Sequence, residues 1–353
     1  MKGMTSGRKS TIYDIATATG SSISTVSMVL NGTWARYRIK EATANRILEC
    51  AQTLGYQVNM KARGLRLSRS GLAGMIIPHY RNRFFAGLAQ TFEDSARSRG
   101  LCPIVVSTQR DPAVELSVTQ TLLSQRVEML FIAGVRNPTP LNTLCDEADV
   151  VSINLDLPGD GAPSVVSDNR AGARVITDVM IDKLIAAGRS PQDLVLLGGV
   201  PHEYATEMRM AGFFEAFAAR QISPGSDAVE LCGYNAAAAR HALARRQEKH
   251  GRVPAGMLMN AINAFEGLVH FASQLPRDAL REAVVGCFDW DPFAAHLPFD
   301  VTMLHQDVQR IVSEAFSLVD NREAGVHPRV VVPMNFGEMF DDDERTIKEE
   351  HDR

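Results

Sequence analysis

The sequence predicts a small all-α domain at the N-terminus and, behind it, an α/β core built from two doubly wound parallel-sheet subdomains. Two observations predict this division. Three short segments in the first 57 residues carry apolar residues at helical spacing, and from Leu72 onward short apolar runs alternate with helical patterns about ten times. Such βα repeats build parallel sheets with helices on both faces, and about ten units exceed one compact sheet. We therefore expect two subdomains with a cleft between them, where ligands bind beyond the carboxyl ends of the strands.

Charge is divided unevenly between the two parts. Residues 1–70 carry 11 Lys or Arg against 3 Asp or Glu, a net charge of +8, whereas the remaining residues carry 26 basic against 38 acidic side chains, a net charge of −12. A basic module on an acidic body is suited to binding phosphate groups through one end only. A solvated, mildly basic domain has the same composition, so charge alone leaves nucleic-acid binding open.

Cysteine usage and hydropathy indicate the cellular compartment. The five cysteines are odd in number and form no CxxC pair, which predicts reduced thiols in a cytoplasmic protein. No apolar run approaches the ~20 residues that span a bilayer. A signal peptide has an apolar stretch after its basic segment, and the basic N-terminal segment of this sequence is not followed by one. We expect no membrane partner.

The first two helical segments are joined by a tight turn. The first spans Thr11–Thr19 and is broken by Gly20, and the second begins at Ser22, a favourable N-cap, and ends at Asn31-Gly32. A third segment covers about residues 40–54. A helix, a tight turn and a second helix form a helix-turn-helix motif, whose second helix enters the major groove of DNA. A packed three-helix bundle without DNA binding has the same pattern.

Five sequence motifs resemble the LacI/GalR family of bacterial repressors, in the order that the family has them. They are TIYDIATATGSSISTVSMVLNG (Thr11–Gly32), LGYQVNMKARGLR (54–66), PHYRNRFF (Pro78–Phe85), SVVSDNRAGAR (Ser164–Arg174) and EMRMAGFFEAF (Glu207–Phe217). The resemblance covers about residues 11–337. It implies a homodimeric regulator, a repressor of carbohydrate-metabolism genes, that binds near-palindromic double-stranded operator DNA. It also implies a periplasmic-binding-protein-like core that responds to a small sugar or sugar derivative.

The headpiece residues expected to contact DNA lie on the two helices of the motif and at their caps. They are Thr11, Tyr13, Ser22, Ser24, Thr25, Ser27, Met28 and Asn31. Polar side chains of this kind reach base edges and phosphates in the major groove. Met28 stands where most family members have Arg, so it offers apolar contact in place of a bidentate bond to guanine.

Two further segments are expected to touch DNA. The segment NGTWARYRI after the second helix is about three residues longer than the common family form and resembles the fructose-repressor subgroup. Its Arg36 and Arg38 either contact phosphates or belong to an exposed basic loop. In the hinge, Asn59, Ala62 and Leu65 match positions that the family uses in the minor groove, where a leucine wedge kinks the duplex. The alternative for Leu65 is a plain linker residue.

The resemblance also assigns effector-binding residues in the core. They are Phe84, Phe85, Asn154, Asp168, Arg209, Asn260, Asp289 and Trp290. Planar polar groups grip sugar hydroxyls, and an aromatic wall covers the apolar face of a sugar ring. The structural alternatives are core packing for the aromatic residues, an internal ion pair for Arg209, and turn or helix capping for Asn260 and Asp168. Departures from the family pattern at Ala261 and Phe288 indicate a ligand different from those of the best-known relatives.

The expected domains follow from these patterns. They are a headpiece at 10–57, a hinge at 58–70, a core at 71–337 and a charged tail at 338–353. Three strands are expected to cross between the subdomains, which assigns 71–167 and 302–328 to the N-subdomain and 168–300 and 329–337 to the C-subdomain.

Two other functions share such a core, namely a sugar-modifying enzyme and a sugar-binding protein. The sequence contains no GxGxxG, GxxxxGK[ST], HExxH or GxSxG motif and no metal-ligand cluster, so we expect no catalysis, no cofactor and no metal. The basic headpiece argues against a pure sugar receptor.

Overall fold

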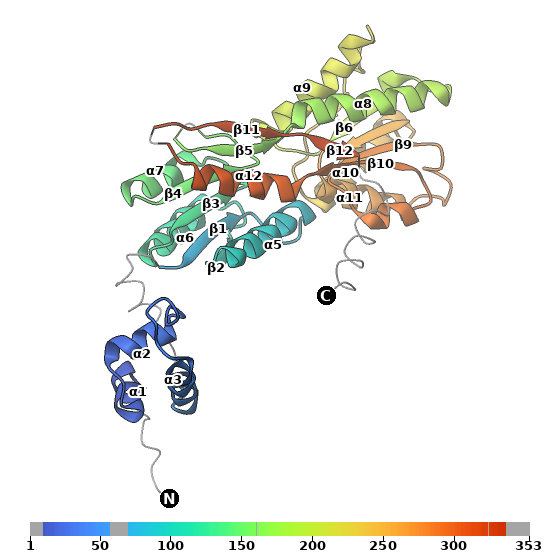
Figure 1. Ribbon diagram of the computed structural model, residues 1–353. Helices are drawn as coiled ribbons and strands as arrows, with labels where there is room; N and C mark the ends of the chain where they lie inside the picture. The colour runs from blue at the N-terminus through green and yellow to red at the C-terminus, as the bar shows by residue number, and fades with distance from the viewer. Residues whose placement is uncertain (1–9, 57–69, 160, 324, 337–353) are drawn as a thin grey trace, which may run out of the picture. The chain divides into compact units, whose positions relative to one another are not determined.

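The computed structural model of this chain describes residues 10–56, 70–159, 161–323 and 325–336 (Figure 1). The chain divides into two compact units between Ser70 and Gly71. The expected hinge contacts Asn59, Ala62 and Leu65 lie outside the described residues, as does the charged tail.

The described part of the N-terminal unit, residues 10–56, is called the headpiece below and contains three helices: α1 (Ile12–Thr19), α2 (Ile23–Leu30) and α3 (Glu41–Thr53). Each begins and ends within one residue of the predicted segment. Every helix packs against the other two. Their inward faces form one apolar core, which consists of Ile15, Ala16, Val26, Val29, Ala44, Ile47 and Ala51.

Local hydrogen bonds fix the geometry of the helix-turn-helix motif. The amide of Thr11 donates to the carboxylate of Asp14 at 2.7 Å, which caps the first turn of α1. Gly20 ends α1 in the left-handed conformation, with φ of 62°, which glycine adopts without a steric penalty. The hydroxyl of Ser22 then caps α2 by accepting the amide of Thr25 at 3.1 Å.

The first sheet of the core is parallel throughout, with strand order β11-β5-β4-β3-β1-β2. Helices α5 and α12 cover one face, and α6 and α7 cover the other (Figure 1). Its elements, called the N-subdomain below, are β1 (Leu72–Ile77), α5 (Arg83–Ser98), β2 (Cys102–Ser107), α6 (Pro112–Ser124), β3 (Met129–Ala133), α7 (Thr139–Glu147), β4 (Val151–Leu155), β5 (Ser164–Ser167), α12 (Val308–Asp320) and β11 (Arg329–Val332).

The second sheet has the order β12-β10-β9-β8-β6-β7, and β12 alone among these strands is antiparallel. Helices α8 and α9 pack on one face and α10 and α11 on the other. Its elements, called the C-subdomain below, are α8 (Asn169–Ala186), β6 (Leu194–Leu197), α9 (Tyr204–Ala219), β7 (Val229–Glu230), α10 (Ala236–His250), β8 (Gly256–Met259), α11 (Ile262–Ala272), β9 (Val284–Phe288), β10 (Val301–Gln306) and β12 (Met334–Phe336), with short 3₁₀ turns at Pro191–Asp193 and Pro292–His296.

The chain crosses between the two subdomains three times, at Asp168, Asp307 and Pro333. Two of these crossovers lead from a strand directly into a helix, and the aspartate at the junction caps that helix. Asp168 accepts the amide of Ala171 at 3.1 Å, and Asp307 accepts the amide of Arg310 at 2.9 Å. A carboxylate at a helix N-terminus also interacts favourably with the helix dipole.

The expected subdomain boundaries differ from this topology in two places. Strand β10 pairs with β9, so residues 302–306 belong to the C-subdomain and not to the N-subdomain. Strand β11 pairs with β5, so residues 329–332 belong to the N-subdomain and not to the C-subdomain. Which sheet a strand joins is decided by partners far away in the sequence, and the local hydrophobic pattern carries no information about them.

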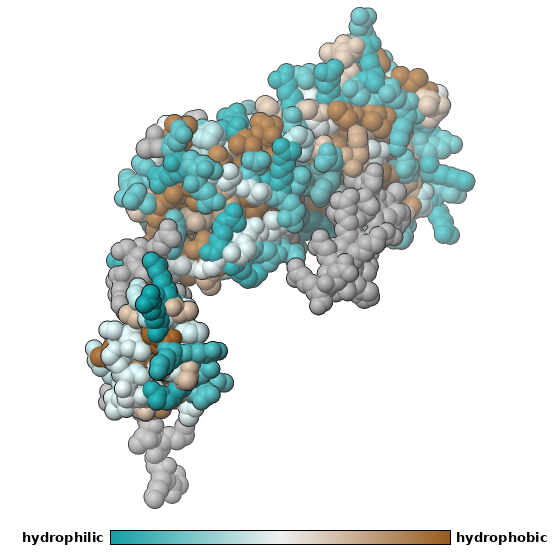
Figure 2. All heavy atoms as spheres, in the orientation of Figure 1, coloured by the Kyte–Doolittle hydropathy of each residue, from teal (hydrophilic) through white to brown (hydrophobic). Residues whose placement is uncertain are grey.

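Apolar side chains are gathered in the clusters between the sheets and their helices. On the face seen in Figure 2, polar side chains separate the exposed apolar ones into small patches. Among the described residues, no helix combines the length and the apolar character that a bilayer span requires.

Candidate functional site

The outward face of α2 is polar and open to solvent. Ser22, Ser24 and Asn31 are exposed, and Thr25 and Met28 are partly exposed. Hydroxyl and amide groups donate to and accept from base edges, and a methionine side chain packs on a thymine methyl group. The arrangement is therefore that of a helix prepared to enter a major groove.

Three other predicted headpiece residues differ in exposure. Tyr13 on α1 is 64% exposed, whereas Thr11 is partly exposed and its hydroxyl bonds to Asp14 at 2.7 Å. Ser27 departs from the expectation, because it is only 8% exposed and its hydroxyl accepts the side-chain amide of Asn31 at 3.3 Å. Its place inside the turn of α2 supports the helix and does not offer the hydroxyl to DNA.

The longer loop after α2 is held to the headpiece by its apolar residues. Trp34 and Ile39 pack against the headpiece core, and the amide of Ile39 donates to the carbonyl of Trp34 at 3.1 Å. Between these anchors, Arg36 and Arg38 are exposed, and Arg38 has a left-handed backbone with φ of 56°. Two guanidinium groups on an anchored loop are suited to phosphate contacts.

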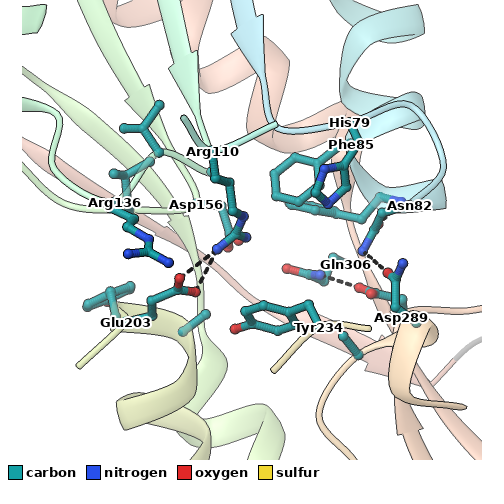
Figure 3. Close-up of a pocket in the computed structure, with 18 of the residues that line it drawn as sticks. His79, Asn82, Phe85, Arg110, Arg136, Asp156, Glu203, Tyr234, Asp289 and Gln306 are labelled. Atoms are coloured by element: carbon teal, nitrogen blue, oxygen red, sulfur yellow. Dashed lines mark hydrogen bonds and ion pairs between the residues drawn. The ribbon is translucent and has the colours of Figure 1, made fainter. Parts of the chain in front are cut away.

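A cavity of about 170 Å³ lies in the core between the two subdomains (Figure 3). It is found beyond the carboxyl ends of the strands of both sheets, as expected for open α/β folds. Its polar lining consists of His79, Asn82, Arg110, Arg136 and Asp156 from the N-subdomain and His202, Glu203, Tyr204, Arg209, Tyr234, Asn263, Asp289 and Gln306 from the C-subdomain.

Asp156 follows β4 directly and is the acid with the most perturbed titration in this cavity. Burial raises the pKa of Asp156 to about 6, with the nearby Asp289 acting in the same direction and Arg209 opposing it. Its Oδ1 atom is buried and finds no hydrogen-bond partner among the described residues. Leaving a buried carboxylate oxygen unpaired is costly, and a ligand hydroxyl in the adjoining cavity would satisfy it if it reached the atom.

Arg209 on α9 forms the floor of the cavity on the C-subdomain side. Its Nε donates to Oδ1 of Asn169 at 2.7 Å, and its Nη1 donates to the backbone carbonyl of Asn260. The guanidinium lies 4.2 Å from the centroid of the Phe288 ring, a cation–π contact. These contacts hold a buried cation, 3% exposed, in one orientation.

Asp289 connects the cavity to the crossover strands. Its Oδ1 accepts the side-chain amide of Gln306, and its Oδ2 accepts the amide of Ile262 at 3.4 Å. The other end of the Gln306 side chain accepts the hydroxyl of Ser167 at 2.7 Å. A continuous row of hydrogen bonds therefore runs from a crossover segment to the wall of the cavity.

Polar contacts join the two subdomains at the cavity. Nη1 of Arg110 donates to both carboxylate oxygens of Glu203, at 2.7 and 2.8 Å (Figure 3). The guanidinium of Arg110 also lies 4.9 Å from the ring centroid of Tyr234. On the other side, the side-chain amide of Asn82 donates to Oδ1 of Asn263 at 3.1 Å. Closure of the cleft is thus stabilised by contacts within the protein itself.

Four residues that line the cavity have a left-handed backbone, which non-glycine residues adopt at a cost. They are Arg110 (φ 59°), Asp156 (φ 62°), His202 (φ 64°) and Asp289 (φ 73°). Conformations of this kind gather at functional sites, where the surrounding structure imposes them.

Of the eight effector residues predicted from the sequence, Phe84, Phe85, Arg209 and Asp289 line the cavity. The two phenylalanine rings meet edge to face at 5.1 Å, and both are also part of the N-subdomain core. Asn260 lies directly behind the lining, where its Oδ1 is buried without a partner among the described residues.

The other three predicted effector residues lie elsewhere. Asn154 is fully buried inside the N-subdomain, where it exchanges amide hydrogen bonds with Asn142 at 3.1 and 3.2 Å. Asp168 caps α8, which was its structural alternative. Trp290 lines a second cavity beside Val301 and meets the His305 ring edge to face at 6.2 Å. We therefore remove these three from the candidate site.

Four other lining residues were not predicted from the sequence: Arg110, Asp156, Glu203 and Tyr234. Each follows a strand of the predicted series within a few residues, and that position was the available signal, because ligands bind at the carboxyl ends of such strands. The described residues contain no group of three or more His, Cys, Asp or Glu side chains that could hold a metal ion.

Comparisons with known proteins match both the headpiece and the fold of the core. A family model described as bacterial regulatory proteins, lacI family, matches residues 11–59. The ribitol operon repressor of Klebsiella aerogenes is 40% identical over 192 residues, which are 54% of this chain and 71% of that protein. The crystal structure of the Lac repressor dimer bound to operator and the anti-inducer ONPF covers 94% of this chain with 98% of its own, at a TM-score of 0.75 and 22% identity. The Cra regulator from Pseudomonas putida in complex with fructose 1-phosphate covers 76% of this chain with 99% of its own, at a TM-score of 0.67 and 20% identity.

Proposed function

The chain belongs to the LacI family of bacterial regulatory proteins, and from this premise we propose that a small sugar-like compound in the cleft sets its affinity for operator DNA. It is a sequence-specific DNA-binding regulator of carbohydrate-metabolism genes, and it acts as a repressor. The observation that carries the proposal is the cavity itself, whose polar walls come from both subdomains. A ligand that touches both walls favours the closed arrangement and shifts the population of conformations.

The headpiece is the part that binds DNA. Ser22 at the N-cap and the outward side chains of Ser24, Thr25 and Met28 on α2 would enter the major groove. The anchored loop with Arg36 would contact phosphates. One headpiece reads few base pairs, so we place two of them, from a homodimer, on a near-palindromic operator. The Lac repressor is a dimer on its operator in a structure of the same fold.

The cleft is the part that binds the effector. Asp156, Arg209 and Asp289 are charged groups held at its walls, and the edge of Phe85 supplies an apolar surface. The similar repressor from Klebsiella aerogenes is named for a ribitol operon, which makes pentitols the first compounds to test. We propose regulation in the cytoplasm, where the operator lies, and no catalysis by the core.

The proposal is tested by operator binding with and without ligand. DNA fragments bound by the full chain identify the operator, and fluorescence anisotropy then gives its affinity in the presence of pentitols, hexitols and pentoses. We expect one of these compounds to change operator affinity. Arg209→Ala should abolish that change while operator affinity itself stays nearly the same, because Arg209 lies in the core. Arg189→Ala removes an exposed arginine of the same subdomain and should behave like the parent. An unaltered ligand response of Arg209→Ala would show that the proposed cavity is not the effector site.

A further inference from the structure

The charged groups of the cavity are balanced. Three arginines and three carboxylates line it: Arg110, Arg136, Arg209, Asp156, Glu203 and Asp289. His79 adds no positive charge near neutral pH, because burial and the neighbouring Arg110 lower the pKa of His79 below its usual value. A ligand that enters therefore meets no net positive field.

Two of these arginines, Arg209 and Arg110, already form hydrogen bonds within the protein. Arg209 is held by Asn169 and by the backbone of Asn260. Arg110 is paired through both oxygens of Glu203, and its charge also acts on the buried Glu115 behind it, where it opposes the burial that raises the pKa of Glu115. Nη1 of Arg110 is therefore committed to Glu203. Arg209 is held by two neutral groups, and its charge acts on the nearby carboxyl of Asp156, whose pKa it lowers.

The remaining arginine lies at the rim. Arg136 is exposed to solvent, and Figure 3 shows it on the same side of the cavity as Glu203. An ion pair with an exposed side chain contributes little, because water and salt screen it. Arg136 therefore adds little to the attraction of an anion into a cavity whose charges are otherwise balanced.

Two polar atoms of lining residues lack a hydrogen-bond partner in the described part of the chain, and one hydroxyl group of a ligand could bond to both of them. Oδ1 of Asp156 is a buried acceptor without a partner, and Nε of Arg110 is a buried donor without one, among the described residues. The charge of Arg110 also acts on Asp156, where it lowers the pKa of the carboxyl against the larger effect of burial. A hydroxyl both donates and accepts, so polyol hydroxyls can satisfy both atoms, whereas a phosphate or carboxylate oxygen can only accept and is repelled by Asp156.

We propose that the effector is an uncharged polyhydroxy compound, and that Glu203 excludes phosphorylated and carboxylated forms of it by holding Arg110. This inference rests on the proposed function of the cleft and adds the charge of the ligand and the residue that selects for it. An anion that pairs with Arg110 would have to separate Arg110 from Glu203 and leave the Glu203 carboxylate facing it. Like charges brought together in an interface weaken binding strongly. We expect the neutral compound to bind the native chain at least about 100-fold more tightly than its monophosphate.

The inference is tested with a substitution that removes one charge. Glu203→Gln keeps the shape of the side chain but releases Arg110, so affinity for the monophosphates should rise by about tenfold or more while affinity for the neutral compounds changes less. Glu207→Gln is the matched control, because Glu207 is partly exposed in the first turn of α9, the helix that Glu203 precedes, and does not line the cavity. Titration calorimetry of the full chain with pentitols, hexitols and pentoses, each alongside its monophosphate, measures both series. Thermal unfolding of each variant establishes that it is folded.

The outcomes separate this inference from the function it rests on. Tighter binding of the monophosphate than of the neutral parent by the native chain would overturn the inference alone, and so would an unchanged selectivity in Glu203→Gln. If the chain binds its operator but none of the compounds of either series, the effector part of the proposed function is wrong, and the inference is wrong with it. Neutral binding by the native chain, together with phosphate binding gained in Glu203→Gln but not in Glu207→Gln, supports both.

Discussion

Asp156 is a partly buried acid whose titration is affected by a second acid, Asp289. Its titration changes the stability of the ligand-free protein. Burial raises the pKa of Asp156 to about 6, above the value near 4 of an unfolded aspartate. The folded state therefore binds the proton more tightly than the unfolded state does. Stability is lost as pH rises through the window from about 4 to 6, and at neutral pH the loss is about 3 kcal/mol.

A first prediction follows for Asp156→Asn. The amide cannot ionise and asparagine tolerates the left-handed backbone, so the variant should gain up to about 3 kcal/mol in free energy of unfolding at pH 7.5. The gain should be about half as large at pH 5, where the native carboxyl is partly protonated. Denaturant unfolding of the full chain without ligand at both pH values measures this. An equal gain at both pH values would contradict the assignment, and Asp146→Asn, an exposed acid on α7, should show no gain.

The two acids of the cavity also show which site residues could be predicted. Asp289 belongs to a motif after a strand, and the resemblance selected it as one of the residues that line the cavity. Asp156 was missed in favour of Asn154, two residues earlier, although both follow the same apolar run. Residues two apart in a strand share one face, but the positive φ of Asp156 ends that alternation. A sequence pattern does not reveal a backbone change at one residue, so it could not distinguish Asp156 from Asn154. Trp290 was misplaced for a similar reason, because it follows Asp289, whose φ is also positive.

The second prediction concerns the N-caps of two headpiece helices, α2 and α3. Ser22 caps α2 through the amide of Thr25, whereas Lys40 stands at the N-cap of α3 and provides no side-chain hydrogen bond. Ser22→Ala should therefore lower headpiece stability by about 1 kcal/mol, and Lys40→Ser should raise it by a similar amount. Thermal unfolding followed by the circular dichroism of the headpiece transition tests both. A shift of the same sign for the two variants would mean that capping does not control these helices.

The turn after β3 carries the third prediction. Gly134 has φ of 63°, and a Cβ there would lie 2.7 Å from the ring of Phe85 and from Pro78. Gly134→Ala should thus displace the aromatic wall of the cavity as well as strain the turn. Gly100→Ala is the control, because Gly100 also has positive φ but open space around it. We expect Gly134→Ala to be less stable than Gly100→Ala by at least about 1 kcal/mol and to bind ligand more weakly. Equal free energies of unfolding for the two variants would show that the Phe85 wall shifts without loss of stability.

Element types and their order could be predicted, but the pairing of the last strands could not. Periodicity and caps located α1, α2 and α3 within a residue, because those signals are local. Strand β10 joins its sheet through hydrogen bonds with β9, more than 10 residues away in the sequence. Strand β11 joins the other sheet through hydrogen bonds with β5, more than 160 residues away. Local composition does not encode a partner at such a distance.

At the scale of the whole molecule, the division of charge gives the fourth prediction. The +8 carried by residues 1–70 is doubled in a dimer, so several phosphates should be neutralised on binding, each contributing a slope of about −0.9 to the dependence of log K on log salt. Operator affinity should fall by about 10³-fold or more between 50 and 200 mM salt. Binding of a neutral ligand to the core should barely change over the same range. Anisotropy and calorimetry across that range measure the two, and a salt-independent operator affinity would argue against phosphate contacts by the headpiece.

The central claim is that one chain couples a ligand in the cleft to DNA on the headpiece. The most direct test is operator affinity of the full chain, measured by anisotropy at a fixed salt concentration with and without a neutral polyol at a concentration that calorimetry shows to be saturating. Coupling between two sites is typically about 1–3 kcal/mol and reciprocal. The account predicts a change in operator affinity of about 5-fold or more, with the same factor in ligand affinity when operator is bound. Identical operator affinity with the cleft occupied and empty would contradict it.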